Sequence, residues 1–223
     1  MSAVVRVKIC GITNLLDARA ACEAGANTLG FNFYEKSPRC VARSEAARIR
    51  SQIPPSVEAV GVFVNTQPMD IFALAVSVRL KAAQLHGEEK PQDIADLSRV
   101  IPIIKAFRVD GDFRLDLLPK YAKACAFLLD APAEAGQYGG TGETFDWSIA
   151  AQAAKSHRII LAGGLKVGNV AQAIRTVRPY GVDVASGVES KPGKKDHGLM
   201  REFIMEVRRA EKELEEDSEK TGT

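Results

Sequence analysis

Cysteine and histidine are scarce in this chain, which has four cysteines and three histidines among 223 residues. No two cysteines form a C-x-x-C motif, and no histidines form a ligand motif such as H-E-x-x-H. Widely spaced cysteines are typical of reduced thiols in a chain large enough to fold without disulfides. We therefore expect a cytoplasmic protein with no protein-held zinc and no other metal site.

Long apolar runs and a dominant charge are also missing. The longest apolar stretches, such as residues 101–104 and 182–185, fall far short of the ~20 residues that a membrane-spanning helix needs, and the N-terminus has no apolar signal core. The 30 basic and 28 acidic residues leave a formal charge of +2, and no Lys/Arg-rich run is interleaved with aromatic residues. These absences disfavour a membrane protein and a nucleic-acid-binding protein.

The composition is that of an ordinary globular domain, with 46% hydrophobic and 26% charged residues. Short apolar segments rich in β-branched residues alternate with segments of helical periodicity. The predicted strands are residues 4–9, 27–33, 57–64, 82–85, 101–107, 125–129, 158–162 and 182–185. The predicted helices are residues 15–24, 44–52, 69–78, 92–100, 113–124, 147–155, 170–177 and a last one from 198 onward.

Repeated strand and helix units are typical of a parallel sheet covered by helices. Eight units in about 210 residues favour an α/β fold of the (β/α)8 barrel type in a single domain over an open doubly wound sheet, which usually has fewer strands. Gly25 is expected to end the first helix, and Asn169 to cap the seventh. Residues 1–207 would form the barrel. Residues 208–223, with four basic and six acidic side chains, would form a charged extension of the last helix or a disordered tail.

Residues at the C-terminal ends of barrel strands ring one open face, where reactive groups gather. Cys10 ends the first predicted strand and is either a small buried apolar residue or a reactive thiol. Lys8 lies on the same strand face, where its charge would lower the pKa of that thiol or pair with Asp183. Asp130 follows three apolar strand residues, so it either caps a turn or acts as a general acid whose pKa partial burial raises.

Glycines at two strand ends predict a phosphate site. Gly163 and Gly164 follow the seventh strand, where bare backbone permits close approach of a ligand. Ser186, Gly187 and Glu189 follow the eighth, and their S-x-x-E spacing is typical of a capping box that leaves backbone amides free for an anion. Strand-end glycines also serve simply as turn residues, but their presence in adjacent loops is similar to the phosphate cradle of many barrels.

Two loops supply further candidates. Arg39 follows the second strand directly after Pro38, and its guanidinium is either solvated or placed to grip a carboxylate with two hydrogen bonds. The glycine-rich segment 136–142 lacks the Gly-Lys-Ser/Thr ending of a nucleotide-binding P-loop. We therefore expect that segment to be a mobile lid over the site.

At these residues the sequence closely resembles the phosphoribosylanthranilate isomerases, barrel enzymes of tryptophan biosynthesis. The resemblance covers nearly the whole chain in order, and the combination of KICGIT, SPR, GGTG-x-x-FDW and SGVE makes it specific. The matching segments are VKICGIT (7–13), GFNFYEKSPR (30–39), VGVFVN (60–65), QLHG (84–87), FLLDA (127–131), GGTGETFDW (139–147), LAGGL (161–165), VDVASGVE (182–189) and PGKKD (192–196).

The resemblance implies an Amadori rearrangement of N-(5-phosphoribosyl)anthranilate, a small-molecule substrate, by a monomer or homodimer without a cofactor. Asp130 would be the general acid at the furanose ring oxygen, and Cys10 the general base at C2′. Arg39 would bind the anthranilate carboxylate, and Asp183 a ribose hydroxyl. His86 is expected to be a packed residue at the rim. The residues expected to bind the phosphate are Gly163, Gly164, Ser186 and Gly187.

Two alternatives remain open. The isomerase of histidine biosynthesis runs the same rearrangement with two aspartates on a barrel whose halves each carry a phosphate loop, and a dual-substrate version would combine both activities. This chain has Cys10 on the first strand and no second glycine-pair motif in its first half. A non-catalytic sugar-phosphate-binding barrel would keep the phosphate loops but could dispense with Cys10 and Asp130.

Overall fold

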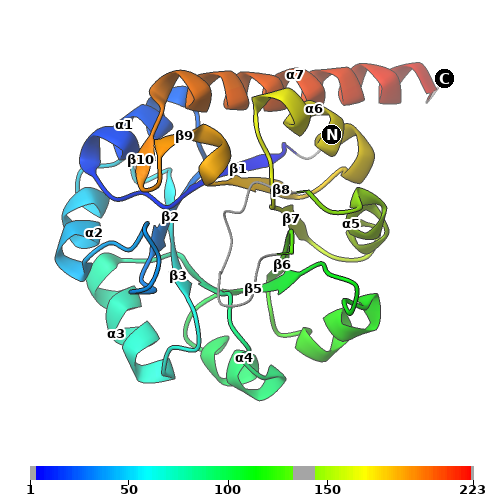
Figure 1. The fold of residues 1–223 in the computed structure, drawn as a ribbon. Helices are drawn as coiled ribbons and strands as arrows, with labels where there is room; N and C mark the ends of the chain where they lie inside the picture. The colour runs from blue at the N-terminus through cyan, green and yellow to red at the C-terminus, as the bar shows by residue number, and fades with distance from the viewer. Residues whose placement is uncertain (1–3, 133–143, 222–223) are drawn as a thin grey trace.

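The computed structural model describes residues 4–132 and 144–221, which form a closed barrel of parallel strands in the order β1 to β8 (Figure 1). The (β/α)8 prediction is confirmed, and each predicted strand boundary lies within two residues of the observed one. The strands are β1 (Arg6–Cys10), β2 (Thr28–Asn32), β3 (Glu58–Phe63), β4 (Ala82–Leu85), β5 (Ile103–Arg108), β6 (Ala126–Asp130), β7 (Ile159–Leu161) and β8 (Gly181–Val184).

Helices follow the strands and form an outer ring around the barrel (Figure 1). They are α1 (Leu15–Ala24), α2 (Arg43–Arg50), α3 (Pro68–Val78), α4 (Pro91–Leu97), α5 (Trp147–Ala154), α6 (Val167–Val177) and α7 (His197–Thr221). The fifth unit differs from the prediction, because its helix is a short 3₁₀ segment, η1 (Leu115–Tyr121). Pro119 lies inside it and has no N–H to donate, which is incompatible with a regular α-helix there.

One of the two helix-end predictions is confirmed and one is wrong. Gly25 ends α1 in the left-handed conformation, with φ of 99°. Asn169 is not the N-cap of α6, because that helix begins after Lys166; Asn169 is its third residue and takes part in the capping box. The Asn169 side chain instead reaches back, accepting from the Lys166 amide at 2.8 Å and donating to the Gly164 carbonyl at 2.9 Å. It thereby ties the start of α6 to the loop after β7.

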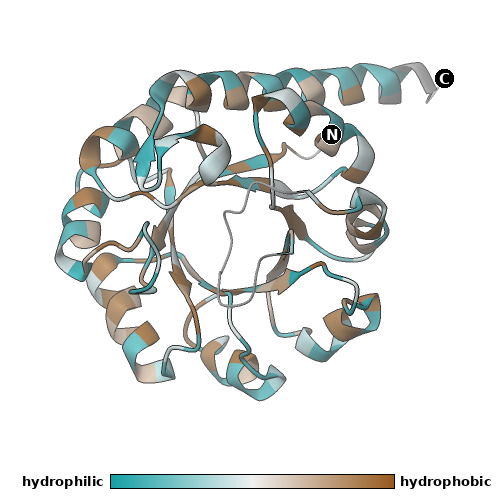
Figure 2. Cartoon of the chain, viewed as in Figure 1, coloured by the Kyte–Doolittle hydropathy of each residue, from teal (hydrophilic) through white to brown (hydrophobic). Residues whose placement is uncertain are grey.

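Alternate strand residues divide between two apolar layers. Val7, Ile9 and Leu29 are fully buried between the strands and the surrounding helices. Residues of the opposite strand faces, such as Ile104 and Leu128, fill the barrel interior. Figure 2 shows hydrophobic residues concentrated on the strands and on parts of each helix. The strand period of two therefore separates a packed outer layer from an interior that leads to the open face.

Closure of the barrel depends on β1 pairing with β8. The register sets Arg6 beside Gly181, Lys8 beside Asp183 and Ile9 beside Val184. Between β8 and α7 the chain inserts a 3₁₀ turn, η2 (Ser186–Val188), and a small antiparallel hairpin of β9 (Glu189–Lys191) and β10 (Lys194–Lys195). This hairpin lies on the same side of the barrel as the ends of β1 and β2 (Figure 1).

Helix α7 packs against α6 and α1, and its last turns run past the edge of the barrel (Figure 1). The helix is continuous across position 207, where the sequence predicts a boundary. Arg208 donates to the Val5 carbonyl at 2.9 Å, and Ala210 is fully buried. The first residues of the predicted tail thus contact the barrel, while the division into residues 1–207 and 208–223 stays a prediction.

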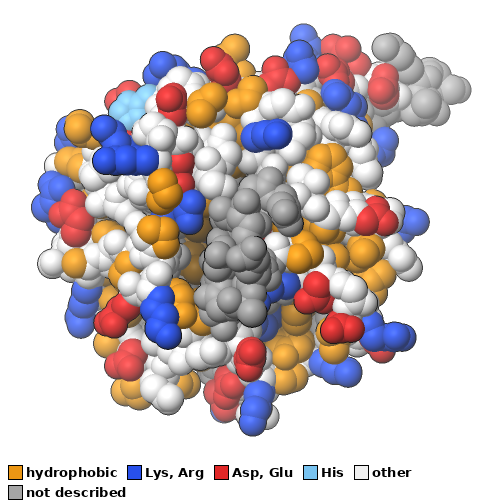
Figure 3. Space-filling model, viewed as in Figure 1, with side chains coloured by type: hydrophobic (Ala, Val, Ile, Leu, Met, Phe, Trp, Pro, Cys, Tyr) orange, Lys and Arg blue, Asp and Glu red, His pale blue; other side chains and the backbone are white. Residues whose placement is uncertain are grey.

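Charged side chains of both signs are scattered around the face viewed in Figure 3. Within the parts of the chain that the structure describes, no helix combines the length and apolar character needed to cross a bilayer.

A buried ion pair anchors the loop that follows β4. Lys105 of β5 donates to Glu89 at 2.9 Å and to the carbonyls of Leu85 and Gly87. The Lys105 and Glu89 side chains are only 3% and 6% exposed. Glu89 also accepts from the amides of Gly87 and of Asn65, which lies in the loop after β3. Burial lowers the pKa of Lys105, and the Glu89 charge offsets part of that shift.

We expect Lys105→Met to destabilise the fold by about 3–5 kcal/mol, because it leaves the Glu89 carboxylate buried without its cation. Denaturant unfolding at pH 7, followed by circular dichroism, measures this loss. Arg99→Met is the control, since the Arg99 and Asp96 side chains are largely exposed and 4.0 Å apart. A Lys105→Met protein as stable as the Arg99→Met protein would contradict a role for this pair in anchoring the loop.

Candidate active site

A pocket of about 620 Å³, open mouth included, lies at the C-terminal ends of the strands. Cys10 at the end of β1 and Asp130 at the end of β6 both line it. In the closed ring these strands are separated by β7 and β8, so the two residues approach the pocket from different sides. The structure thus brings together the thiol and carboxyl group that the sequence singles out. The other predicted site residues lining this pocket are Arg39, Gly163, Gly164, Asp183 and Ser186.

The Cys10 thiol is partly buried among charged groups. Gly30, its neighbour on β2, leaves room for it, since a Cβ on Gly30 would lie 2.8 Å from the Cys10 sulfur. Burial and the negative charge of Asp183 raise the pKa of Cys10 and outweigh the lowering effects of Lys8 and Lys195. Lys8 does lower the pKa of Cys10, as the sequence predicts. The net shift is nevertheless upward, so the prediction that Lys8 brings the pKa of Cys10 down toward neutrality is wrong.

Lys8 pairs with Asp183, the other arrangement that the sequence allows. The Lys8 ammonium lies 2.9 Å from Asp183 Oδ1, with side-chain exposures of 5% and 9%. Burial alone would lower the pKa of Lys8, but the charges of Asp183 and Cys10 reverse the shift and raise it. Lys8 is therefore held as a cation beneath Cys10, and Asp183 presents its carboxylate at the pocket wall.

Asp130 lies next to His86, whose side chain the sequence places at the rim. His86 Nε2 is 3.4 Å from Asp130 Oδ2, and both side chains are 8% exposed. Asp130 Oδ1 accepts from the Ala131 amide at 3.0 Å. His86 follows β4 and lines the pocket together with Gln84, so it is part of the site and not only a packing residue.

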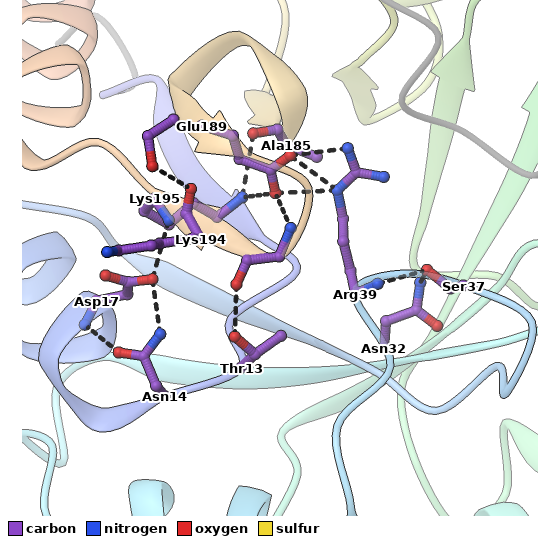
Figure 4. Close-up of polar contacts among 12 residues, drawn as sticks. Thr13, Asn14, Asp17, Asn32, Ser37, Arg39, Ala185, Glu189, Lys194 and Lys195 are labelled. Atoms are coloured by element: carbon purple, nitrogen blue, oxygen red, sulfur yellow. Dashed lines mark hydrogen bonds and ion pairs between the residues drawn. The ribbon is translucent and has the colours of Figure 1, made fainter.

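Arg39 is held by a carboxylate from the other end of the chain (Figure 4). Its Nε and Nη2 donate to Glu189 at 2.9 and 2.8 Å, a bidentate pair with side-chain exposures of 12% and 4%. The Lys195 ammonium also donates to Glu189 at 2.9 Å and to the Ala185 carbonyl at 3.0 Å. Burial would raise the pKa of Glu189, but Arg39 and Lys195 reverse this and lower it.

These contacts overturn the capping box predicted at Ser186 and Glu189. The 3₁₀ turn η2 begins after Ala185 with no side-chain cap, because the Glu189 carboxylate is engaged by two cations instead. Figure 4 shows the network continuing to α1, where Asp17 accepts from the Lys195 amide at 2.9 Å. The hairpin β9–β10 is thereby joined both to Arg39 and to the start of α1.

The glycines of the predicted phosphate site lie where backbones approach closely. Gly163 and Gly164 have φ of 79° and 61°, a region that side chains disfavour. Gly187 is the one predicted member that does not line the pocket. It packs against the loop after β7, since a Cβ there would lie 1.9 Å from the Leu165 carbonyl oxygen. The predicted lid, residues 136–142, lies outside the described residues.

Comparison with known proteins identifies the family. The family model described as N-(5′-phosphoribosyl)anthranilate (PRA) isomerase matches residues 7–206. The chain belongs to this isomerase family. An N-(5′-phosphoribosyl)anthranilate isomerase of Pelobacter propionicus is 52% identical over 201 residues, which cover 90% of this chain and 94% of that protein.

Solved structures of PRA isomerases show the same fold. The Thermotoga maritima phosphoribosyl anthranilate isomerase superposes with a TM-score of 0.85 at 45% identity, covering 92% of this chain and 98% of that one. A PRA isomerase in complex with reduced 1-(o-carboxyphenylamino)-1-deoxyribulose 5-phosphate has a TM-score of 0.82 at 42% identity, with coverages of 92% and 98%.

Sequence reasoning about this PRA isomerase family member missed Lys195 altogether and the part that Glu189 has in the site. Glu189 pairs with Arg39, 150 positions earlier in the chain, and Lys195 joins them by donating to Glu189. No local spacing marks such a pair, and only the barrel's topology places the loop after β2 against the hairpin after β8. The sequence gives only a weak indication that Gln84 and His86 belong to the site: they are two positions apart, and alternate residues of one strand share a face.

Among the residues that the structure describes, no group of three or more His, Cys, Asp or Glu side chains is arranged to hold a metal ion.

We expect two substitutions to move the pKa of Cys10 in opposite directions. Lys8→Met removes a cation and should raise it, whereas Asp183→Asn removes an anion and should lower it. The rate of iodoacetamide alkylation at Cys10, resolved by peptide mass spectrometry, rises with pH as the thiolate forms. The curve of the Cys10 alkylation rate against pH should therefore move to higher pH in Lys8→Met and to lower pH in Asp183→Asn. The exposed Cys125 is the internal control. Shifts of Cys10 in the same direction in both variants would refute this electrostatic account.

Proposed function

We propose that this chain catalyses the Amadori rearrangement of N-(5′-phosphoribosyl)anthranilate to 1-(2-carboxyphenylamino)-1-deoxyribulose 5-phosphate, an isomerisation in tryptophan biosynthesis. Membership of the isomerase family supports the reaction. The observation that carries the mechanism is the presence of Cys10 and Asp130 in one pocket, approaching from β1 and β6. A barrel that only bound sugar phosphates would need neither group.

Asp130 acts as the general acid that opens the sugar. It gives its proton to the furanose ring oxygen while the lone pair of the anilino nitrogen forms the C1′=N bond and the C1′–O bond breaks. The products of this step are the open-chain iminium ion and the Asp130 carboxylate. The buried position of Asp130 beside His86 limits competing solvent around the group that transfers the proton.

Cys10 acts as the general base that completes the isomerisation. Its thiolate takes the proton from C2′, and the electrons of that C–H bond form the enolamine and neutralise the iminium nitrogen. The enolamine then tautomerises to the ketone. Because the iminium acidifies C2′, the step needs no metal or organic cofactor. Burial and Asp183 raise the pKa of Cys10, whereas the cations Lys8 and Lys195 favour the thiolate.

Both ends of the substrate are held away from the reacting carbons. Arg39 uses Nε and Nη2 for Glu189, which leaves Nη1 for the anthranilate carboxylate at the pocket wall. Asp183 binds a ribose hydroxyl. The backbone around Gly163, Gly164 and Ser186 receives the phosphate, and Gly187 permits the loops after β7 and β8 to come together.

We expect Cys10→Ala and Asp130→Asn each to lower kcat by about 10²–10⁴-fold, the usual contribution of a general acid or base. The assay follows loss of substrate fluorescence with freshly made phosphoribosylanthranilate. Cys40→Ala is the matched control for Cys10→Ala, since Cys40 is outside the pocket lining and should be dispensable. Wild-type turnover in either pocket variant would remove that residue from the mechanism.

We expect Gly187→Ala to weaken binding of phosphate-bearing ligands at least ~10-fold, because the added Cβ would collide with the Leu165 carbonyl and force apart the two loops. Gly168→Ala is the control, since nothing lies within 4 Å of the Cβ it adds at the start of α6. Isothermal titration calorimetry with the reduced product analogue measures the dissociation constants of the Gly187→Ala and Gly168→Ala proteins. Equal affinities would show that the close approach at Gly187 does not shape the phosphate site.

A further inference from the structure

Two buried polar atoms at the floor of the pocket have no hydrogen-bond partner among the described residues: Gln84 Oε1 and His86 Nε2. Gln84 is 1% exposed and the His86 side chain 8%. A buried polar group without a partner is costly, so an unpaired atom of a pocket-lining residue is available to hydrogen-bond a group in the pocket. Both residues come from the end of β4, two positions apart, and line the pocket together.

The contact between these side chains indicates which ring nitrogen of His86 carries the proton, given the orientation that the Gln84 amide has in this structure. Gln84 Nε2 lies 3.3 Å from His86 Nδ1, and a side-chain amide nitrogen only donates. In this amide orientation His86 Nδ1 accepts, which places the hydrogen of a neutral ring on Nε2. Asp130 Oδ2 lies 3.4 Å from this Nε2, although the two atoms are not hydrogen-bonded in this structure. The separation is longer than a full hydrogen bond, and contacts of this kind tighten as a reaction proceeds.

The imidazole is held in this orientation by its surroundings. The His86 amide donates to the Phe63 carbonyl at 2.8 Å, which continues the pairing of β4 with β3. The following loop is anchored by the buried pair of Lys105 and Glu89. On the other side, Asp130 Oδ1 accepts from the Ala131 amide. The ring and the carboxyl group thus face each other from two rigid strand ends.

We propose that His86 is a positioning residue for Asp130, with its tautomer set by Gln84; this inference rests on the proposed function. With its hydrogen on Nε2, the ring cannot accept the Asp130 proton on that side. The proton therefore goes to the furanose oxygen. The carboxylate left behind then receives the His86 N–H as a charge-assisted hydrogen bond, and His86 keeps its own proton throughout.

The kinetic test compares two substitutions of His86. His86→Leu should lower kcat by about 10–100-fold with KM changed less than about 3-fold, because it removes one hydrogen bond to a charged group. His86→Gln, whose amide N–H can take the place of Nε2–H, should recover kcat to within about 5-fold of wild type. In an Asp130→Asn background, His86→Leu should cause no further loss, since its effect acts through the carboxyl group. Unfolding midpoints confirm that each variant is folded.

A spectroscopic test is independent of turnover. The chain has three histidines, so loss of one signal set in His86→Gln assigns the ¹⁵N resonances of His86 directly. We expect a protonated Nε2 and an unprotonated Nδ1. A protonated Nδ1, a His86→Gln variant no better than His86→Leu, or losses that multiply with Asp130→Asn would each overturn the proposal. If the wild-type protein does not isomerise phosphoribosylanthranilate, the proposed function fails, and the ¹⁵N signals still decide the tautomer.

Discussion

Pairing of β1 with β8 closes the barrel, and the register of that pairing places Lys8 opposite Asp183. Their ion pair occupies the barrel interior directly below Cys10, so the interaction that completes the fold also sets the charge around the proposed base. A buried lysine would ordinarily lose its charge, but here the carboxylate on the neighbouring strand retains it. Fold closure and site electrostatics therefore share one pair of residues.

A second cluster of charged side chains lies near the pocket. Glu189 is held between Arg39 and Lys195, which orients Arg39 through two of its nitrogens and leaves the third for a ligand. Burying these three charged groups costs desolvation free energy, but it fixes the Arg39 guanidinium in one direction. A freely rotating arginine in the loop after β2 would lose more conformational entropy on binding a substrate carboxylate.

Much of the fold could be predicted from the sequence because its signals are local. Apolar runs bounded by turn residues predict every strand, and the rule that reactive residues lie at strand ends selects Cys10 and Asp130. Local signals misled at the two predicted helix caps. The sequence predicts helix caps at Asn169 and Ser186. Helix α6 instead begins three residues before Asn169, after Lys166, and Glu189, the expected partner of Ser186, binds cations from β10 and from the loop after β2.

The net pKa shift of Cys10 could not be predicted from its neighbour Lys8, because it depends on burial and on Asp183, 173 positions further along the chain. The same holds for the tautomer proposed for His86, which depends on its contact with Gln84. The site residues themselves were found through the strand ends and the family resemblance. Their mutual electrostatics required the closed barrel.

The central claim is that an acid and a base act on one sugar from different sides of the pocket. A crystal structure of this protein with reduced 1-(o-carboxyphenylamino)-1-deoxyribulose 5-phosphate tests it most directly. We expect the Cys10 sulfur within about 3.5 Å of C2′, the Asp130 carboxyl group within hydrogen-bond distance of the oxygen that forms the furanose ring, and the phosphate against Gly163 and Gly164. A ligand whose C2′ lies away from Cys10, or whose sugar oxygen does not contact Asp130, would contradict the account.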